Sequence, residues 1–201
     1  MIEKKAITSK KINDLIASRW SGRAYDPDRK VSREEIISLL EAARWAPSCY
    51  GDQPWRFIVF DRHSRNSGWK DAYSCLSEGN QVWAVNAPVL ILSVSDSILS
   101  KNGKPNRWAQ YDTGAAAFSL CLQATDRGLM VHQMGGFDAV RARELFAIPD
   151  QFIPMAMMAV GYQLPLDRIG EDIRARELSE RRRHPLQHNF FEDNWGNPFT
   201  V

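Results

Sequence analysis

The segment from residue 107 to residue 127 constrains the fold most, because its apolar side chains surround nearly the whole circumference of a helix. A helix of that kind is buried, so we expect it at the centre of the molecule or packed against another subunit. Gly128 would end this helix in a C-cap role. The apolar residues are Ala115, Ala116, Ala117, Phe118, Leu120, Cys121, Leu122 and Ala124.

Four further runs predict β-strands, at residues 56–60, 89–94, 129–133 and 153–162. The first alternates apolar and polar side chains, as a half-buried strand does. The second follows Pro88 and is rich in β-branched residues, which favours a buried strand.

Shorter helices are expected over residues 9–18, 69–78 and 138–146, and another begins at Ser32. Ser32 and Glu35 form a capping box, because the carboxylate three residues on can reach back to free backbone N–H groups. Pro47 would end that helix. Helices and strands mix without regular alternation, so we predict one α+β domain over residues 1–201 rather than a doubly wound sheet.

The charge balance argues against several classes of partner. The 201 residues carry 26 basic and 24 acidic side chains, and a net charge of +2 gives no electrostatic case for nucleic acid or an anionic membrane. No apolar run reaches the roughly 18 residues of a membrane span. The first residues also lack an apolar signal core, so we expect a cytoplasmic protein.

The common motifs of catalysis and metal binding are missing. The sequence has no G-x-G-x-x-G after a strand, no G-x-x-x-x-G-K-[ST] and no G-x-S-x-G. Cys49, Cys75 and Cys121 include no C-x-x-C pair, so neither a zinc site nor a disulfide is indicated. His184 and His188 are four residues apart, but no acidic or thiol ligand accompanies them. This pattern is typical of an enzyme whose cofactor does the chemistry.

Two polar segments suggest where such a cofactor would bind. Arg19-Trp20-Ser21-Gly22-Arg23 offers two guanidinium groups and a hydroxyl within five residues, which suits a phosphate or an electron-rich ring edge. The alternative for this segment is a solvated turn with charges on it. The run from Ala46 to Trp55 is rich in turn residues and leads into a strand, so its backbone can lie against a flat ligand.

In order and spacing these segments resemble the FMN-dependent nitroreductase family, and the resemblance covers nearly the whole chain. The first is similar to the family's R-x-S-x-[RK] motif, and PSCYGDQPW at residues 47–55 is similar to P-S-S-x-N-x-Q-P-W. Asn80, the run VHQMGGFD at residues 131–138, and Arg181 with Arg183 complete the similar segments. The resemblance implies a mostly antiparallel sheet flanked by helices, in an intertwined homodimer with FMN at the interface.

The resemblance gives the basic residues separate roles. Arg19 and Ser21 would bind the FMN phosphate, with Trp20 contributing its backbone. Arg23 would lie beside the N1/O2 edge of the flavin ring, where a fixed cation favours the reduced anion. Arg181 and Arg183 would close over the phosphate, although a solvated helix end is the alternative reading of this cluster.

The second motif would reach the flavin that is bound mainly by the partner subunit. Cys49 stands where the family usually has Ser, and Gly51 where it usually has Asn. Position 51 therefore lacks a side-chain amide, and backbone must replace any polar contact from it. The residues implied to contact the flavin are Pro47, Ser48, Cys49, Tyr50 and Gln53.

The remaining implied contacts follow the flavin ring. Asn80 would hydrogen-bond the pyrimidine edge, unless it is a helix-end cap. The backbone N–H of Gly136 would point at N5 or O4, because a glycine lets backbone approach a flat ring. His132 either flanks this pocket or is a buried strand histidine. The segment implied to follow the ring is Gln133, Met134, Gly135 and Gly136.

The resemblance thus implies an oxidoreductase that moves hydride from NADH or NADPH through flavin N5 to a small acceptor, in a ping-pong mechanism. Nitroaromatics, quinones and activated alkenes are the expected acceptors, and no side chain need act as acid or base. The alternatives are a specialised reductase of the same fold (dehalogenase, dihydropteridine or enone reductase) and a non-catalytic flavin-binding protein. The apolar tail, with Trp195, would pack on its own domain or reach a partner subunit.

Overall fold

A single four-stranded sheet organises the chain in the computed structural model, which describes residues 2–65 and 68–200. Its strands are β1 (Trp55–Asp61), β2 (Val89–Asp96), β3 (Met130–Met134) and β4 (Phe152–Gly161). They lie in the order β1-β2-β4-β3, and every neighbouring pair is antiparallel. The expected α+β fold with an antiparallel sheet is confirmed, and each expected strand is present within two residues of its predicted bounds.

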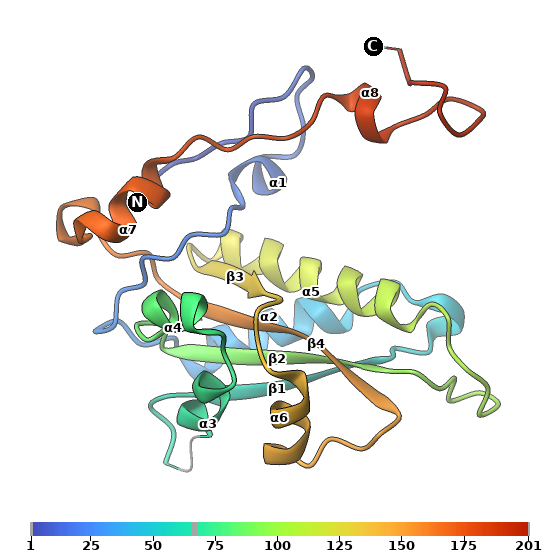
Figure 1. The fold of residues 1–201 in the computed structure, drawn as a ribbon, viewed down its shortest axis with the longest axis horizontal. Helices are drawn as coiled ribbons and strands as arrows, with labels where there is room; N and C mark the ends of the chain where they lie inside the picture. The colour runs from blue at the N-terminus through green and yellow to red at the C-terminus, as the bar shows by residue number, and fades with distance from the viewer. Residues whose placement is uncertain (1, 66–67, 201) are drawn as a thin grey trace.

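Helices cover both faces of this sheet (Figure 1). On β2, Leu90 and Leu92 point to one face, whereas Val89 and Ile91 point to the other. The first face packs against α3 (Trp69–Ser74), α4 (Glu78–Ala84) and α6 (Ala139–Leu145). The second packs against α2 (Arg33–Arg44) and α5 (Ala109–Asp126). Because both faces of the central strands are buried, these strands read as continuous apolar runs in the sequence.

The expectation for the long helix is confirmed on one side only. Ala116, Leu120 and Ala124 of α5 are buried against the sheet. Tyr111 and Phe118 on the same helix are 80% and 41% exposed. This exposed apolar side leaves the expected contact with another subunit open.

Local capping decides where several helices begin and end. Ser32 Oγ accepts from the N–H of Glu35 and the Glu35 carboxylate accepts from the N–H of Ser32, so the expected capping box is present. The helix expected over residues 9–18 is confined to α1 (Asp14–Ser18), because the Asn13 side chain caps the N–H of Leu15. Gly128 has a φ of 69°, the left-handed conformation of a C-cap glycine.

The prediction of one helix over residues 69–78 was wrong in its extent. α3 ends at Ser74, and α4, which the sequence did not predict, begins at Glu78. Leu76 between them pairs with Phe137 in an isolated β-bridge. This contact joins residues 61 positions apart, so no local pattern could announce it.

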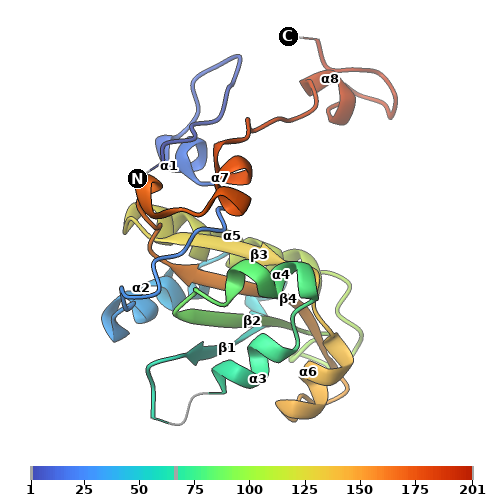
Figure 2. The ribbon, with the colours of Figure 1, turned by 60° about the vertical axis from the view of Figure 1, so that its left-hand side comes forward.

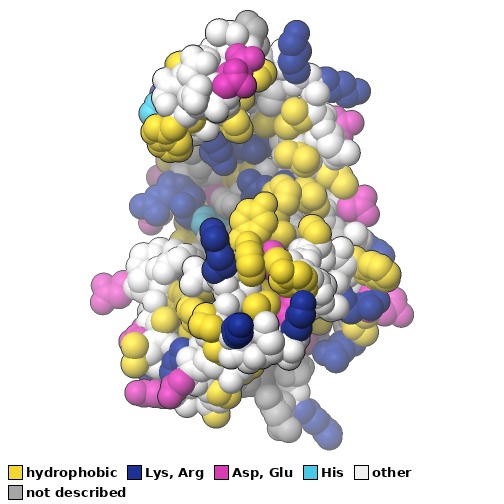
Figure 3. All heavy atoms as spheres, turned by 90° about the vertical axis from the view of Figure 1, so that its right-hand side faces the viewer, with side chains coloured by type: hydrophobic (Ala, Val, Ile, Leu, Met, Phe, Trp, Pro, Cys, Tyr) yellow, Lys and Arg dark blue, Asp and Glu magenta, His cyan; other side chains and the backbone are white. Residues whose placement is uncertain are grey.

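The two terminal segments lie apart from the sheet (Figures 1 and 2). After β4 the chain forms the 3₁₀ turn η2 (Leu166–Arg168), α7 (Glu171–Leu178) and α8 (Leu186–Asn189). Residues 182–190 and 192–200 are exposed throughout, and Trp195 is 92% exposed. The tail therefore does not pack on its own domain. Figure 3 shows hydrophobic side chains on the projecting part that carries these residues.

None of the helices in residues 2–65 and 68–200 combines the length and the hydropathy of a bilayer-spanning segment.

Ser32→Ala should lower the free energy of unfolding by about 1 kcal/mol, because the N–H of Glu35 loses its cap. The melting temperature should fall by about 2–4 °C for a chain of this size. Ser32→Thr keeps a capping hydroxyl and is the matched control. Calorimetry of the three proteins tests this, and equal stability in all three would contradict the role of the capping box.

Candidate functional site

A cation-rich cavity of about 200 Å³ lies where the segment after α1 meets the segment after α7. Six of the residues proposed from the sequence share its lining, although they come from opposite ends of the chain. They are Arg19, Trp20, Ser21, Arg23, Arg181 and Arg183. The first segment is half-buried rather than a solvated turn. The structure thus brings together six residues from two segments that are more than 150 positions apart in the sequence.

Backbone carbonyl groups hold Arg181 in this cavity. Its Nη1 donates to the carbonyl O of Ala17 at 2.8 Å, in the last turn of α1, and to that of Lys4. Arg19 Nη1 donates to Ser21 Oγ at 3.2 Å. Because α7 ends at Leu178, Arg181 and Arg183 lie beyond the helix, and the reading of this cluster as a helix end is wrong.

The cavity concentrates positive charge. Its lining holds six cationic side chains, of Lys4, Arg19, Arg23, Arg176, Arg181 and Arg183, and one carboxylate, of Glu180. Burial lowers the pKa of Arg181, and the neighbouring Arg19 and Arg183 guanidinium groups lower it further. Burial likewise lowers the pKa of Lys4. Such a cluster favours a multiply charged anion, and guanidinium forks with a hydroxyl match the oxygens of a phosphate.

Glu177 of α7 supports the wall of the cavity from behind. Its side chain is fully buried, and its Oε1 accepts a hydrogen bond from the N–H of Arg23 at 2.7 Å. Burial raises the pKa of this carboxyl. A Cβ at Gly22 beside it would lie 2.2 Å from Met130 Sδ, so a side chain there would force Met130 to move. The backbone at Gly22 and Arg23 is therefore fixed by Glu177 on one side and by Met130 on the other.

His132 lies on β3 behind the same segment. Its Nδ1 is 3.0 Å from the carbonyl O of Gly22, and because a carbonyl only accepts, Nδ1 carries the proton. The imidazole also packs on Trp83, with 4.6 Å between ring centroids. Burial, together with the nearby Arg23 and Arg19, lowers the pKa of His132 to about 4. These contacts support the buried strand histidine among the two readings of the sequence.

Asn80 and Gly136, two residues proposed for the flavin ring, contact each other. Asn80 lies in the first turn of α4, and its Nδ2 donates to the carbonyl O of Gly136 at 3.0 Å, so it is not a helix-end cap. A Cβ at Gly136 would lie 2.8 Å from Ser77 Oγ, which explains the glycine. Gly135 next to it faces open space. The Gly135-Gly136 backbone is thus fixed on one side and open on the other.

The two residues before these glycines have different surroundings. Met134 is 2% exposed and belongs to the core, so only its backbone is available to a ligand. Gln133 is exposed, and its Nε2 donates to Cys121 Sγ at 3.4 Å.

The loop at residues 47–53 adopts an unusual backbone. It contains the 3₁₀ turn η1 (Cys49–Gly51), and φ is 58° at Tyr50, 67° at Gly51 and 50° at Gln53. Non-glycine residues in this left-handed region cost on the order of 1–3 kcal/mol each, so the surroundings must hold them. Ser48 Oγ accepts from the N–H of Gln53 at 3.1 Å within the loop. Tyr50 is 70% exposed, and Pro47 is exposed beside it.

This loop and the cation-rich cavity lie at opposite ends of α5. The N–H of Cys49 donates to Asp112 Oδ2 at 3.0 Å, in the first turn of the helix. Trp20 shares the lining of a neighbouring cavity with Thr125, in the last turn. At 1.5 Å per residue, these ends are about 20 Å apart. Within one protomer the structure therefore does not bring the two sets of proposed residues together.

Comparisons with known proteins show the family of the chain. A model of the family described as "Nitroreductase family" matches residues 16–162. The chain belongs to the nitroreductase family. Among solved structures, one described as an oxidoreductase containing FMN is 35% identical, covers 95% of this chain and 96% of its own, and has a TM-score of 0.87.

Two further nitroreductase relatives are informative. A Desulfovibrio desulfuricans protein, provisionally named a nitroreductase and solved in complex with FMN, is 26% identical, with a TM-score of 0.68 and coverage of 90% of this chain and 95% of that one. A Methanothermobacter thermautotrophicus protein, provisionally named an NADH dehydrogenase/NAD(P)H nitroreductase, is 34% identical over 155 residues. That match spans 74% of this chain and 75% of the relative.

In this nitroreductase, several supporting residues escaped the sequence analysis. Glu177 stands in a basic stretch, and nothing local distinguishes it from a solvated helix charge. Asp112 is 4% exposed on α5, and its place among apolar residues of that helix was the sequence signal that could have pointed to it. No sequence signal pointed to Lys4. No cluster of His, Cys, Asp and Glu able to hold a metal occurs among the residues that the structure describes.

His132→Gln should remove a pH dependence of stability. The native pKa of His132, about 4, lies below its ordinary 6.5. The unfolded chain therefore binds the proton first, and stability is lost as pH falls from about 6.5 toward 4, by on the order of 2–3 kcal/mol. The glutamine keeps a donor for the Gly22 carbonyl. Urea unfolding of both proteins between pH 7 and pH 4.5 measures the difference, and parallel curves would contradict this assignment.

Proposed function

We propose that this protein is an FMN-dependent NAD(P)H oxidoreductase that acts on small acceptors such as nitroaromatics and quinones. The observation that carries the proposal is the cavity in which Arg19, Ser21, Arg181 and Arg183 converge. Its surplus of cations over carboxylates matches a phosphate dianion, and a riboflavin-derived cofactor is the phosphate ligand of the relatives. We place this activity in one cytoplasmic domain over residues 1–201.

The chain's own residues supply binding, orientation and electrostatics. Arg19, Ser21, Arg181 and Arg183 hold the phosphate, and Trp20 adds its backbone. Arg23, whose backbone N–H is fixed by Glu177, would place its guanidinium beside the N1/O2 edge of the ring. A fixed cation there stabilises the negative charge that reduction leaves near N1.

The ring itself is oriented by backbone. Asn80 fixes the Gly136 carbonyl, which leaves the open Gly135-Gly136 edge to lie along the N5 side, with Gln133 and Met134 preceding it. When bound, FMN would supply the redox chemistry, taking hydride from NADH or NADPH at N5 and passing it to the acceptor in a ping-pong cycle. Solvent supplies protons, so no side chain acts as acid or base.

The separation of about 20 Å along α5 favours a homodimer. In that assembly the 47–53 loop of one subunit (Pro47, Ser48, Cys49, Tyr50 and Gln53) serves the flavin held by the other's cation-rich cavity. Exposed Tyr111 and Phe118 on α5, and Trp195 in the projecting tail, offer the apolar surface that such an interface needs.

Arg19→Ala should weaken FMN binding roughly 10- to 100-fold, because a charge-assisted contact to the phosphate is lost. The affinity for riboflavin, which lacks the phosphate, should stay unchanged. Arg168→Ala, which removes a guanidinium paired with Asp26 and Asp28 outside the cavity, is the matched control. Fluorescence titration measures all affinities, and an equal loss for FMN and riboflavin would contradict the phosphate role.

Anaerobic mixing of the FMN-loaded protein with NADH or NADPH should bleach the flavin absorption band. Addition of a quinone or a nitroaromatic should then restore it, since one cavity serves donor and acceptor in turn. Stopped-flow absorbance follows both half-reactions. A flavin that stays oxidised with either nucleotide would overturn the enzymatic proposal and leave a flavin-binding protein.

A further inference from the structure

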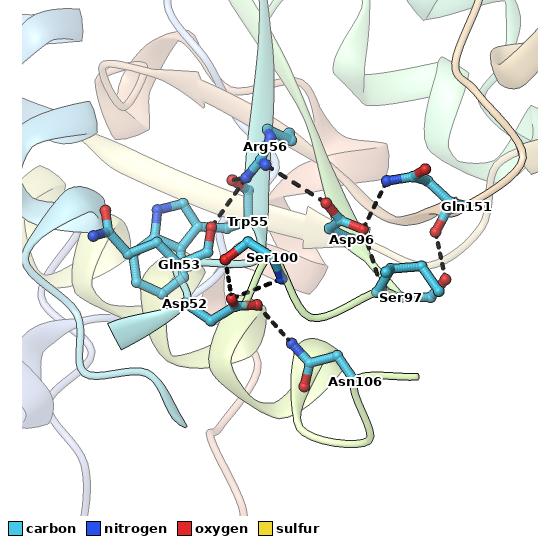
Figure 4. A network of polar contacts seen from close by, with 10 residues as sticks. Asp52, Gln53, Trp55, Arg56, Asp96, Ser97, Ser100, Asn106 and Gln151 are labelled. Carbon is cyan, nitrogen blue, oxygen red and sulfur yellow. Dashed lines mark hydrogen bonds and ion pairs between the residues drawn. The ribbon is translucent and has the colours of Figure 1, made fainter. Parts of the chain in front are cut away.

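Asp52 joins the 47–53 loop to a segment far along the chain, at residues 97–106 (Figure 4). Its Oδ1 accepts hydrogen bonds from the backbone N–H of Ser100 at 3.0 Å and from the Ser100 hydroxyl. Its Oδ2 accepts from Asn106 Nδ2 at 3.1 Å. Both oxygens of one carboxylate are thus engaged, and Asn106 is 6% exposed. Hydrogen bonds that a buried group makes to a charged acceptor are among the stronger ones.

The same part of the chain holds the loop at two more points. Lys101 Nζ lies 4.4 Å from the centroid of the Tyr50 ring, and Trp108 meets that ring edge-on at 6.3 Å. Asp112, at the start of α5, accepts from the N–H of Cys49. Residues 100–112 therefore contact each of the three loop residues Cys49, Tyr50 and Asp52.

The loop requires these outside contacts because its backbone is strained. Tyr50 and Gln53 flank Gly51-Asp52 and both have positive φ, although neither is a glycine. Strained conformations persist only where surrounding structure determines them. Asp52 lies between the two strained residues in the sequence, and the three hydrogen bonds that its carboxylate accepts come from outside the loop.

We propose that Asp52 is a positioning residue for the flavin site. By fastening the loop to Ser100 and Asn106, it holds Ser48, Cys49 and Gln53 in the shape that meets the ring, without touching the ring itself. The inference rests on the proposed FMN site, and it adds a residue whose part in that site comes from contacts particular to this loop.

An exchange of two side chains tests the pair directly. In Asp52→Asn, either orientation of the new amide sets an N–H group against a donor, of Asn106 or of the Ser100 backbone. In the double variant Asp52→Asn/Asn106→Asp, the amide at position 52 donates to a carboxylate at position 106. The other oxygen of that carboxylate still accepts from the N–H of Trp108, as Asn106 Oδ1 does now. Net charge equals that of the original protein.

Asp52→Asn should weaken FMN binding about tenfold and raise KM for the acceptor, and the double variant should return both to within about twofold of wild type. Excess FMN should restore kcat of the single variant, which a misfolded protein would not allow. Gln151→Ala is the matched control. It removes a 3.1 Å bond to Asp96 at the base of the same segment, without contacting the loop.

The outcomes separate the two claims. Unchanged FMN affinity and KM in Asp52→Asn would overturn the positioning role and leave the FMN site standing. So would an equal effect from Gln151→Ala, or a double variant that regains stability in urea without regaining FMN affinity. A wild-type protein that binds no FMN would overturn the proposed function, and the positioning role with it.

Discussion

The candidate site depends on positively charged side chains that segments near the two ends of the chain bring close together. Arg19, Arg181 and Arg183 line one cavity of about 200 Å³, and their mutual repulsion must be offset by the fold. The offset comes from neutral carbonyl groups of Ala17 and Lys4, which accept from Arg181. The cavity therefore keeps a net positive charge that an anion would neutralise. This charge is the physical basis for reading the cavity as a phosphate site. Two solved relatives contain FMN, a flavin that carries such a phosphate.

The rest of the fold positions the other proposed site residues relative to this cavity. Helices bury both faces of the sheet, and α5 packs on one of them with its two ends beside different parts of the proposed site. One end lies beside Trp20, and the other holds the strained loop through Asp112. A rigid helix of this length keeps the two parts from meeting within one protomer, and a second copy of the chain brings them together in the proposed assembly. Apolar residues such as Phe118 and Trp195 are exposed on the single chain, and the proposed assembly would cover them.

Local sequence patterns predicted much of this fold. Apolar runs located the four strands, and Ser32 with Glu35 located the start of α2, because pleat, burial and capping act over a few residues. α4 escaped, because its position depends on the bridge between Leu76 and Phe137. At the site, family resemblance supplied Arg19 and Arg181 together, whereas composition alone could not pair them. Glu177 and Asp52 were missed because their partners lie 154 and at least 48 residues away.

The proposed function requires a phosphate among these guanidinium groups. A crystal structure of the protein grown with FMN would show where that phosphate lies. We expect phosphate oxygens within hydrogen-bond distance of Arg19, Ser21 and Arg181, and a flavin ring that extends toward Arg23 and Gly136. A flavin whose phosphate lies outside this cavity, with Arg19 and Arg181 still bonded only to the chain's own carbonyl and hydroxyl oxygens, would contradict it.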